Sequence, residues 1–125
     1  MNGFMVFLGG GLGAFVRYLL YLILPKVSYF PLCTLVANFL GCLIATMVFL
    51  YFVSKSDTIS VYKLFLIVGF CGGLSTLSAL SLELLEFIQT GEYLRALSYV
   101  LTTTLICTAS VFIGLLIMKQ IFSFK

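Results

Sequence analysis

Residues 31–53 read PLCTLVANFLGCLIATMVFLYFV, and this stretch decides the fold because it contains no charged side chain. A helix needs roughly 20 apolar residues to cross the hydrocarbon core of a bilayer, and the stretch is long enough to do so. Three further stretches are equally apolar. They are residues 4–24, which carry only the charge of Arg17, and residues 64–82 and 97–118, which carry none. We therefore predict four transmembrane helices.

The overall composition supports the same class of protein. Of 125 residues, 62% are hydrophobic and 9% are charged, whereas about a quarter of the residues of a soluble domain are charged. Four spans leave no room for a soluble domain, so the sequence predicts an all-α membrane protein with a single domain over residues 1–125. The first stretch has no basic start, so we expect a retained helix rather than a signal peptide.

The composition argues against several classes of function. The net charge of +3 is small and scattered, which argues against nucleic-acid binding. The chain has no histidine and no carboxylate inside a predicted span except Glu83, at the edge of the third, which we expect to be solvated at the end of that helix. General acid–base chemistry therefore lacks its groups, and we expect no enzyme. The four cysteines lie in the spans without metal-site spacing, and we interpret them as small packing residues. They are Cys33, Cys42, Cys71 and Cys107.

Charges between the spans predict the orientation. With four spans, both termini and the second loop lie on one side, which carries more lysine than the other side. Cytoplasmic loops are enriched in Lys and Arg. We therefore expect the protein to lie in the plasma membrane with both termini in the cytoplasm. The first side holds Lys55, Lys63, Lys119 and Lys125, and the second holds Lys26 and Arg95.

The first predicted helix contains small residues and one cation. Gly9 and Gly13 are four residues apart, a spacing that lets two helix backbones approach closely in lipid. Arg17 follows one turn later. An intramembrane cation is unfavourable unless it extends to the interface or is solvated by protein or water, so Arg17 is either an interfacial residue or an anchor for anions.

The second and third helices contain the other polar groups that need explanation. Thr34 and Asn38 share one helix face, where the Asn38 amide either joins helices or donates N–H groups to an anion. In the third helix, Gly72 and Gly73 are followed at once by hydroxyl residues. We predict a break there, because non-helical backbone at membrane depth marks ion or substrate sites, although a simple kink is the alternative.

The fourth helix carries a series of hydroxyl residues. They are Thr102, Thr103, Thr104, Thr108 and Ser110. These hydroxyls either bond to their own helix or line a polar track, and the spacing does not separate the two. The spans together offer one guanidinium, one carboxamide and many hydroxyls but no acid, a set that suits an anion better than a cation.

Three stretches resemble one known family. They are GGGLGAFVRY at residues 9–18, PLCTLVANFLG at 31–41 and GFCGGLSTLSALSLE at 69–83, and they resemble successive conserved segments of the fluoride channel family, Fluc or CrcB. The resemblance covers essentially the whole chain. It implies a fluoride-selective channel that exports toxic fluoride, built as an antiparallel, dual-topology dimer with two pores along the subunit interface and a central sodium ion.

The resemblance also implies roles for particular residues. The backbone carbonyls of Gly72 and Ser75 would bind the sodium ion. Asn38 would supply the pore amide, and Arg17 would shape the vestibule, with Thr34 nearby. Ser78 and Thr103 would add hydroxyls to the polar pathway, Thr103 at the position of a family serine.

Four positions depart from the family pattern. Leu77 and Leu80 stand where the family has two pore phenylalanines, and leucine has bulk but no aromatic quadrupole. Cys33 replaces a glycine, and Ser75 replaces a threonine. Two explanations compete: a heterodimer whose other subunit supplies the phenylalanines, or a divergent homodimer that conducts weakly. The lysine bias favours the heterodimer, because a dual-topology chain should show almost none.

Two other functions remain as alternatives. One is a non-conducting or regulatory partner subunit of such a channel, which would explain both leucines. The other is a small four-helix multidrug transporter, which resembles this chain in length but needs an acidic residue in its first helix. That helix carries Arg17 and no acid, so the transporter is the weaker alternative.

Overall fold

The structure is a computed structural model that describes residues 2–25, 29–55 and 60–122. Over these residues it is helical and contains no strand. Four helical segments are long and apolar enough to cross a membrane: Asn2–Ile23, Leu32–Ser54, Val61–Gln89 and Tyr93–Phe122. The prediction of an all-α protein with four transmembrane helices is therefore confirmed, and the chain is a multi-pass membrane protein.

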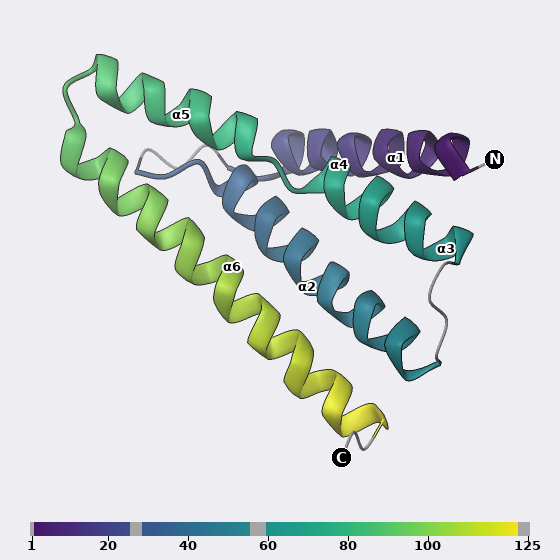
Figure 1. Cartoon of the computed structure of the whole chain (residues 1–125). Coiled ribbons are helices and arrows are strands. Elements are labelled where there is room, and N and C mark those ends of the chain that lie inside the picture. Colours follow the sequence, from purple (N-terminus) through teal and green to yellow (C-terminus); the bar gives the residue numbers. More distant parts are fainter. Residues whose placement is uncertain (1, 26–28, 56–59, 123–125) are drawn as a thin grey trace.

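The third of these segments is composite, whereas the others are single helices (Figure 1). Helix α1 covers Asn2–Ile23, α2 covers Leu32–Ser54 and α6 covers Tyr93–Phe122. The third segment begins with α3 (Val61–Lys63) and widens into the π-helix η1 (Leu64–Cys71). It then continues through the short α4 (Gly72–Leu74), and after a break it resumes as α5 (Leu77–Gln89).

The helices extend beyond the predicted spans at the end where α5 meets α6. We predicted spans that end at residue 82 and restart at residue 97, but α5 runs to Gln89 and α6 starts at Tyr93. Gly91, whose φ is 76°, makes the short turn between them. Glu83 therefore lies within a helix, and our expectation that it sits at a solvated helix end was wrong.

Two pairs of helices build the subunit (Figure 1). Helices α2 and α6 run side by side in the same direction, and α1 lies along η1 and α4. Buried residues on α6 recur at intervals of three, four and seven residues, which places them on one face of the helix. They are Ala96, Tyr99, Thr103, Ser110, Gly114 and Met118.

Glycines bring the backbones of α1 and the third segment into direct contact. A Cβ atom on Gly13 would overlap the carbonyl oxygen of Phe70, and one on Gly9 would overlap that of Phe65. From the other side, a Cβ on Gly73 would overlap the backbone of Gly10. The close packing predicted from the glycine spacing is confirmed, and no larger residue fits at these positions without moving a helix.

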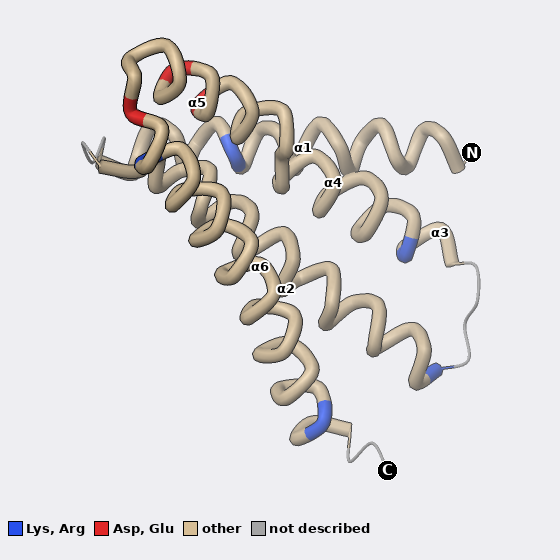
Figure 2. The backbone as a smooth tube through the Cα atoms, turned by 60° about the vertical axis from the view of Figure 1, so that its left-hand side comes forward, with Lys and Arg blue, Asp and Glu red and all other residues tan. Residues whose placement is uncertain are grey.

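Among the described residues, the acidic residues and the lysines lie at opposite ends of the subunit (Figure 2). Acidic residues gather where α5 turns into α6, whereas lysines lie at the opposite end, near the end of α2, in α3 and near the end of α6. Lys26 and Lys125, which also entered the orientation argument, lie outside the described residues. The cytoplasmic placement of the termini stays a prediction.

We expect Gly13→Ala to destabilise the protein and Gly11→Ala to leave it unchanged or slightly stabilised. Alanine favours helix by about 1 kcal/mol over glycine, and nothing lies within 4 Å of a Cβ at Gly11. At Gly13 the added methyl meets backbone, and such overpacking costs about 1–3 kcal/mol. Thermal unfolding of the two purified variants in detergent checks this. Equal midpoints would contradict the close approach of α1 to η1.

Candidate functional site

The break in the third segment consists of Ser75 and Thr76, which are both extended. The Ser75 amide and hydroxyl both donate to the Cys71 carbonyl, at 2.9 and 2.8 Å, and so close the preceding helix. The Thr76 hydroxyl accepts the Ala79 amide at 3.3 Å and caps α5. The predicted break is therefore present, but it follows the glycine pair, because Gly72 and Gly73 remain helical.

Asn38 on α2 binds the broken backbone at two points. Its Oδ1 accepts the Thr76 amide at 2.7 Å, and its Nδ2 donates to the Thr76 carbonyl at 3.5 Å. Gly41, one turn further along α2, lets Ser75 approach, since a Cβ there would lie 2.9 Å from the Ser75 Cβ. Protein groups thus satisfy backbone that no water would reach at membrane depth. In this structure the Asn38 amide joins two helices.

The same bond changes the environment of Gly72. In an uninterrupted α-helix the Thr76 amide would donate to the Gly72 carbonyl four residues earlier. Here that amide donates to Asn38 instead. Gly72 is exposed on the surface of the subunit. Its carbonyl is therefore relieved of its usual helical partner at a position that a ligand or another subunit can reach.

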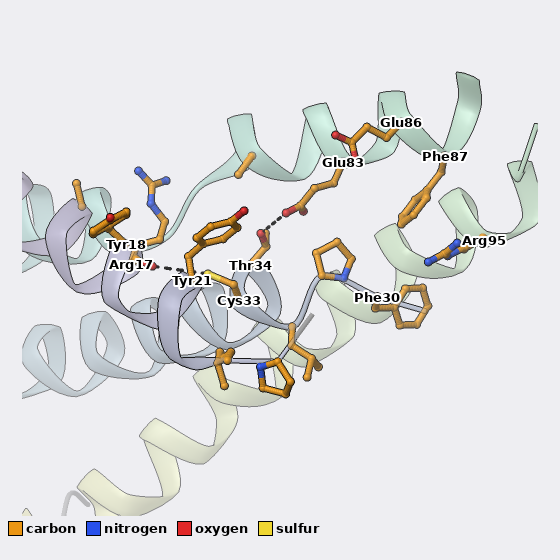
Figure 3. A pocket seen from close by; sticks show the side chains of 16 residues that line it. Arg17, Tyr18, Tyr21, Phe30, Cys33, Thr34, Glu83, Glu86, Phe87 and Arg95 are labelled. Carbon is orange, nitrogen blue, oxygen red and sulfur yellow. Dashed lines mark hydrogen bonds between the residues drawn. The ribbon is translucent and has the colours of Figure 1, made fainter. Parts of the chain in front are cut away.

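Glu83 joins three helices through two short hydrogen bonds. Its Oε1 accepts the Thr34 hydroxyl of α2 at 2.6 Å, and its Oε2 accepts the Tyr99 hydroxyl of α6 at 2.6 Å (Figure 3 shows the bond to Thr34). Thr34 and Tyr99 are both buried. Hydrogen bonds to an ionised carboxylate are stronger than neutral ones. Glu83 is therefore an acceptor at the centre of the polar interior, where the sequence analysis expected donors only.

A cavity of about 740 Å³ surrounds this cluster and is lined by α1, α2, α5 and the start of α6. Arg17, Thr34 and Glu83 all contribute to its lining, and Tyr21 lies between Arg17 and the Thr34–Glu83 contact in Figure 3. The structure therefore brings two of the predicted site residues to one cavity. Whether Arg17 shapes an anion vestibule there stays a prediction.

Arg95 closes one end of the cavity together with aromatic rings. Its Nε donates to the Tyr29 carbonyl at 2.7 Å, and its guanidinium lies 4.4 Å from the centre of the Phe87 ring. It also pairs with Glu92. Phe30 stacks on Tyr99 at 5.3 Å between ring centres. These contacts fix the segment before α2 against α5 and α6, and cation–π contacts of this kind are favourable.

The hydroxyls predicted for the polar pathway are already engaged within the subunit. Buried Thr103 donates to the Tyr99 carbonyl at 2.8 Å, and Ser110 donates to the Cys107 carbonyl at 2.7 Å. The Ser78 hydroxyl is 2.9 Å from that of Thr76. Each hydroxyl keeps free lone pairs but forms a hydrogen bond with a group of its own chain. For Thr103 and Ser110 the partner is a carbonyl of the same helix, which is the first of the two alternatives for the fourth helix. Their role in conduction stays a prediction.

The two leucines at the family's phenylalanine positions lie in different environments. Leu80 is 7% exposed and belongs to the core formed with Leu35, Phe87 and Tyr99. Leu77 is 75% exposed and projects from the first turn of α5. Leu80 therefore fills the interior of its own subunit, whereas Leu77 is free to contact whatever covers the break.

Sequence reasoning missed Tyr99 and Arg95 as site residues, and it misplaced Glu83. Glu83 is the last residue of the third stretch that resembles the family, residues 69–83, so the resemblance itself could have drawn attention to it. Tyr99 and Arg95 lie in no such stretch. Only the packing of α6 brings Arg95 to the cavity and the Tyr99 hydroxyl to Glu83.

The fold and the site define a small helical membrane protein with a broken third helix and a polar cavity beside the break. The family model described as CrcB-like protein, Camphor Resistance (CrcB), matches residues 4–115. The chain therefore belongs to the CrcB family.

Curated relatives match over nearly their whole length. A protein of Flavobacterium psychrophilum named fluoride-specific ion channel FluC is 38% identical over 121 residues, which is 94% of this chain and 97% of the relative. Proteins of the same name from Coxiella burnetii and Pyrococcus abyssi are 35% and 36% identical. The alignments cover 97% of this chain and 100% of the Coxiella protein, and 93% of this chain and 94% of the Pyrococcus protein.

We expect Asn38→Ala to destabilise the protein, because the Thr76 amide and carbonyl lose their partner in a buried environment. An unsatisfied buried group costs about 1–3 kcal/mol. Thr108→Ala is the control, since that hydroxyl is exposed and bonds only to its own helix. Chemical unfolding of both variants measures the difference. An unfolding free energy for Asn38→Ala equal to that of Thr108→Ala would show that the break does not depend on Asn38.

Tyr99→Phe should also lower stability, because it leaves one oxygen of the partly buried Glu83 carboxylate without its donor. The expected loss is again about 1–3 kcal/mol. Tyr93→Phe removes the same atom from an exposed residue on the same helix and should change little. The two variants can be compared by thermal unfolding, and a neutral Tyr99→Phe would argue against the bond to Glu83.

Proposed function

We propose that this chain is a subunit of a fluoride-specific ion channel, which lets fluoride leave the cell down its electrochemical gradient. The observation that carries the proposal is similarity over nearly the full length to relatives named for that activity. The four apolar helices and the broken third segment agree with it.

The cavity offers one chemical route for an anion to approach the membrane interior. Arg17 contributes a guanidinium with several N–H donors to its lining, and Tyr18 and Tyr21 line the same side. Thr34 and Tyr99 direct their hydroxyls to Glu83 and so do not face an anion freely. Attraction of fluoride into the cavity therefore falls to Arg17, while Glu83 holds the neighbouring wall in place.

A second subunit would complete the pathway. At the break, Gly72, Leu77 and Ser78 are exposed on the surface of the subunit, where hydrocarbon would be a poor neighbour for a freed carbonyl and a hydroxyl. We place an antiparallel four-helix subunit over this surface. The lysine-rich end of the chain favours a heterodimer with a related chain of opposite orientation over a homodimer, with the termini of this chain in the cytoplasm and the channel in the plasma membrane.

The same surface fits a structural sodium ion. The Gly72 carbonyl has lost its helical donor to Asn38, and the Ser75 carbonyl belongs to extended backbone. Carbonyl oxygens freed at a helix break are suitable ligands for a monovalent cation. These two residues would hold the ion, which would supply positive charge at the subunit interface.

Efflux from liposomes tests the proposal, with electrodes recording fluoride and chloride. We expect fluoride without chloride, at a low rate from the chain alone because aromatic rings are absent from positions 77 and 80. If the chain alone gives fluoride efflux as fast as the chain with a co-expressed family member, the heterodimer is ruled out. If neither fluoride nor chloride leaves the liposomes, with the chain alone or with a co-expressed family member, the result would favour the non-conducting subunit.

Leu77→Phe should raise fluoride efflux from the chain alone several-fold. The variant restores a ring with a polarised edge at an exposed position, where it displaces no packed neighbour. Leu82→Phe adds the same ring at another exposed site on α5 and should leave the rate unchanged. Equal rates for the two variants would place Leu77 away from the ion pathway.

A further inference from the structure

A second hollow lies beside the cavity, at the turn between α5 and α6. It has a volume of about 410 Å³, and we call it the outer hollow. Arg95 lines both spaces, and among the residues that the structure describes it is the one that the two linings share. The two spaces therefore meet at the Arg95 side chain. The outer hollow is lined by Tyr29, Gly91, Glu92, Tyr93, Leu94 and Arg95.

The Arg95 side chain is held at this boundary from several directions. Its Nε donates to the Tyr29 carbonyl at 2.7 Å. Its guanidinium lies 4.4 Å from the centre of the Phe87 ring (Figure 3) and 5.4 Å from that of the Tyr29 ring. The Arg95 side chain is 23% exposed, whereas that of its ion-pair partner Glu92 is 45% exposed. Arg95 is therefore part of the wall and not a solvated surface charge.

The bond from Arg95 to Tyr29 also fixes the next part of the cavity wall. Phe30 follows Tyr29, lines the cavity and stacks on Tyr99 at 5.3 Å between ring centres. Tyr99 is fully buried and donates to Glu83 at 2.6 Å, so this ring stack is anchored in the core. Loss of the Arg95 side chain would therefore remove the boundary between the two spaces and one attachment of the neighbouring wall.

We propose that Arg95 is a gate residue that separates the cavity from the outer hollow and limits entry from this end to small solutes. Arginine suits the position, because its N–H donors reach a carbonyl and a carboxylate at once while its planar group packs against aromatic rings. Alanine at position 95 has neither the donors nor the bulk. The two spaces would then join into one.

The simpler role for Arg95 is that of an anchor, which only holds the segment before α2 against α6. Loss of an anchor loosens the whole subunit, whereas loss of a gate opens one route into the cavity while the core stays closed. Two cysteines report these events separately. Cys33 lines the cavity, and Cys71 is 3% exposed in the interior.

The alkylation of Cys33 in the purified chain in detergent tests the gate. Its rate is measured with N-ethylmaleimide and with a bulky, neutral polyethylene glycol maleimide, and the modified peptide is identified by mass. The ratio of the bulky to the small rate cancels any change in the reactivity of the thiol itself. We expect this ratio to rise several-fold in Arg95→Ala. It should rise less in Arg95→Gln, whose amide nitrogen takes the place of Nε and keeps a donor for Tyr29.

Leu94→Ala is the matched control. Leu94 is exposed and lines the outer hollow but not the cavity, so its removal widens the hollow without opening the boundary. The ratio at Cys33 should then equal that of the wild type. Cys71 should stay protected in all variants.

A consequence for conduction rests on the proposed function. If fluoride passes through the cavity, a bulky adduct on Cys33 should obstruct it. Treatment with the bulky maleimide should therefore lower fluoride efflux from liposomes more in Arg95→Ala than in the wild type. Replacement of Cys33 by serine in both backgrounds should abolish the difference.

Three results of the alkylation experiment would overturn the gate. The first is an unchanged ratio at Cys33 in Arg95→Ala, and the second is a ratio in Leu94→Ala as high as in Arg95→Ala. The third arises if Arg95→Ala exposes Cys71 as well. In that case Arg95→Gln decides: a raised ratio with Cys71 protected supports the gate, and an unchanged ratio makes Arg95 an anchor. The ratio requires no conduction, so its result does not depend on whether the chain carries fluoride.

Discussion

The bond between the Asn38 amide and the backbone of Thr76 is the interaction on which the rest of the structure depends. It lets the third segment leave helical geometry inside the membrane without leaving the Thr76 amide and carbonyl unpaired. The broken segment then turns α5 toward α6, which brings Glu83 to Thr34 and Tyr99. It also releases the Gly72 carbonyl toward the surface. One side chain on α2 thus creates both the polar interior and the exposed break.

Glycine contacts hold the first half of the third segment while its second half departs. Gly9 and Gly13 admit the backbone of the π-helix η1, and Gly73 admits that of α1. In lipid there is little hydrophobic force between helices, so such close backbone packing provides much of their association. The break is therefore a junction between a part anchored on α1 and a part that packs on α6 through Leu80 and Tyr99.

The polar groups divide into those that serve the fold and those left for a ligand or another subunit. Glu83, Thr34 and Tyr99 satisfy one another, and Thr103 bonds to its own helix. Arg17 remains at the cavity, with Gly72 and Leu77 on the outer surface of the break. This division suits a channel subunit in the CrcB family, in which a second subunit would cover the break.

The sequence by itself determined the four membrane helices, the close glycine packing and the family, because these depend on runs of apolar residues and on local spacing. It also predicted a break in the third helix and the importance of Asn38, although it placed the break at the glycines. Only the tertiary structure decided that Glu83 turns inward, and that Leu80 is core while Leu77 is exposed. Each of these depends on the rotation of one helix against another, which an almost uniformly apolar helix does not encode in its own residues.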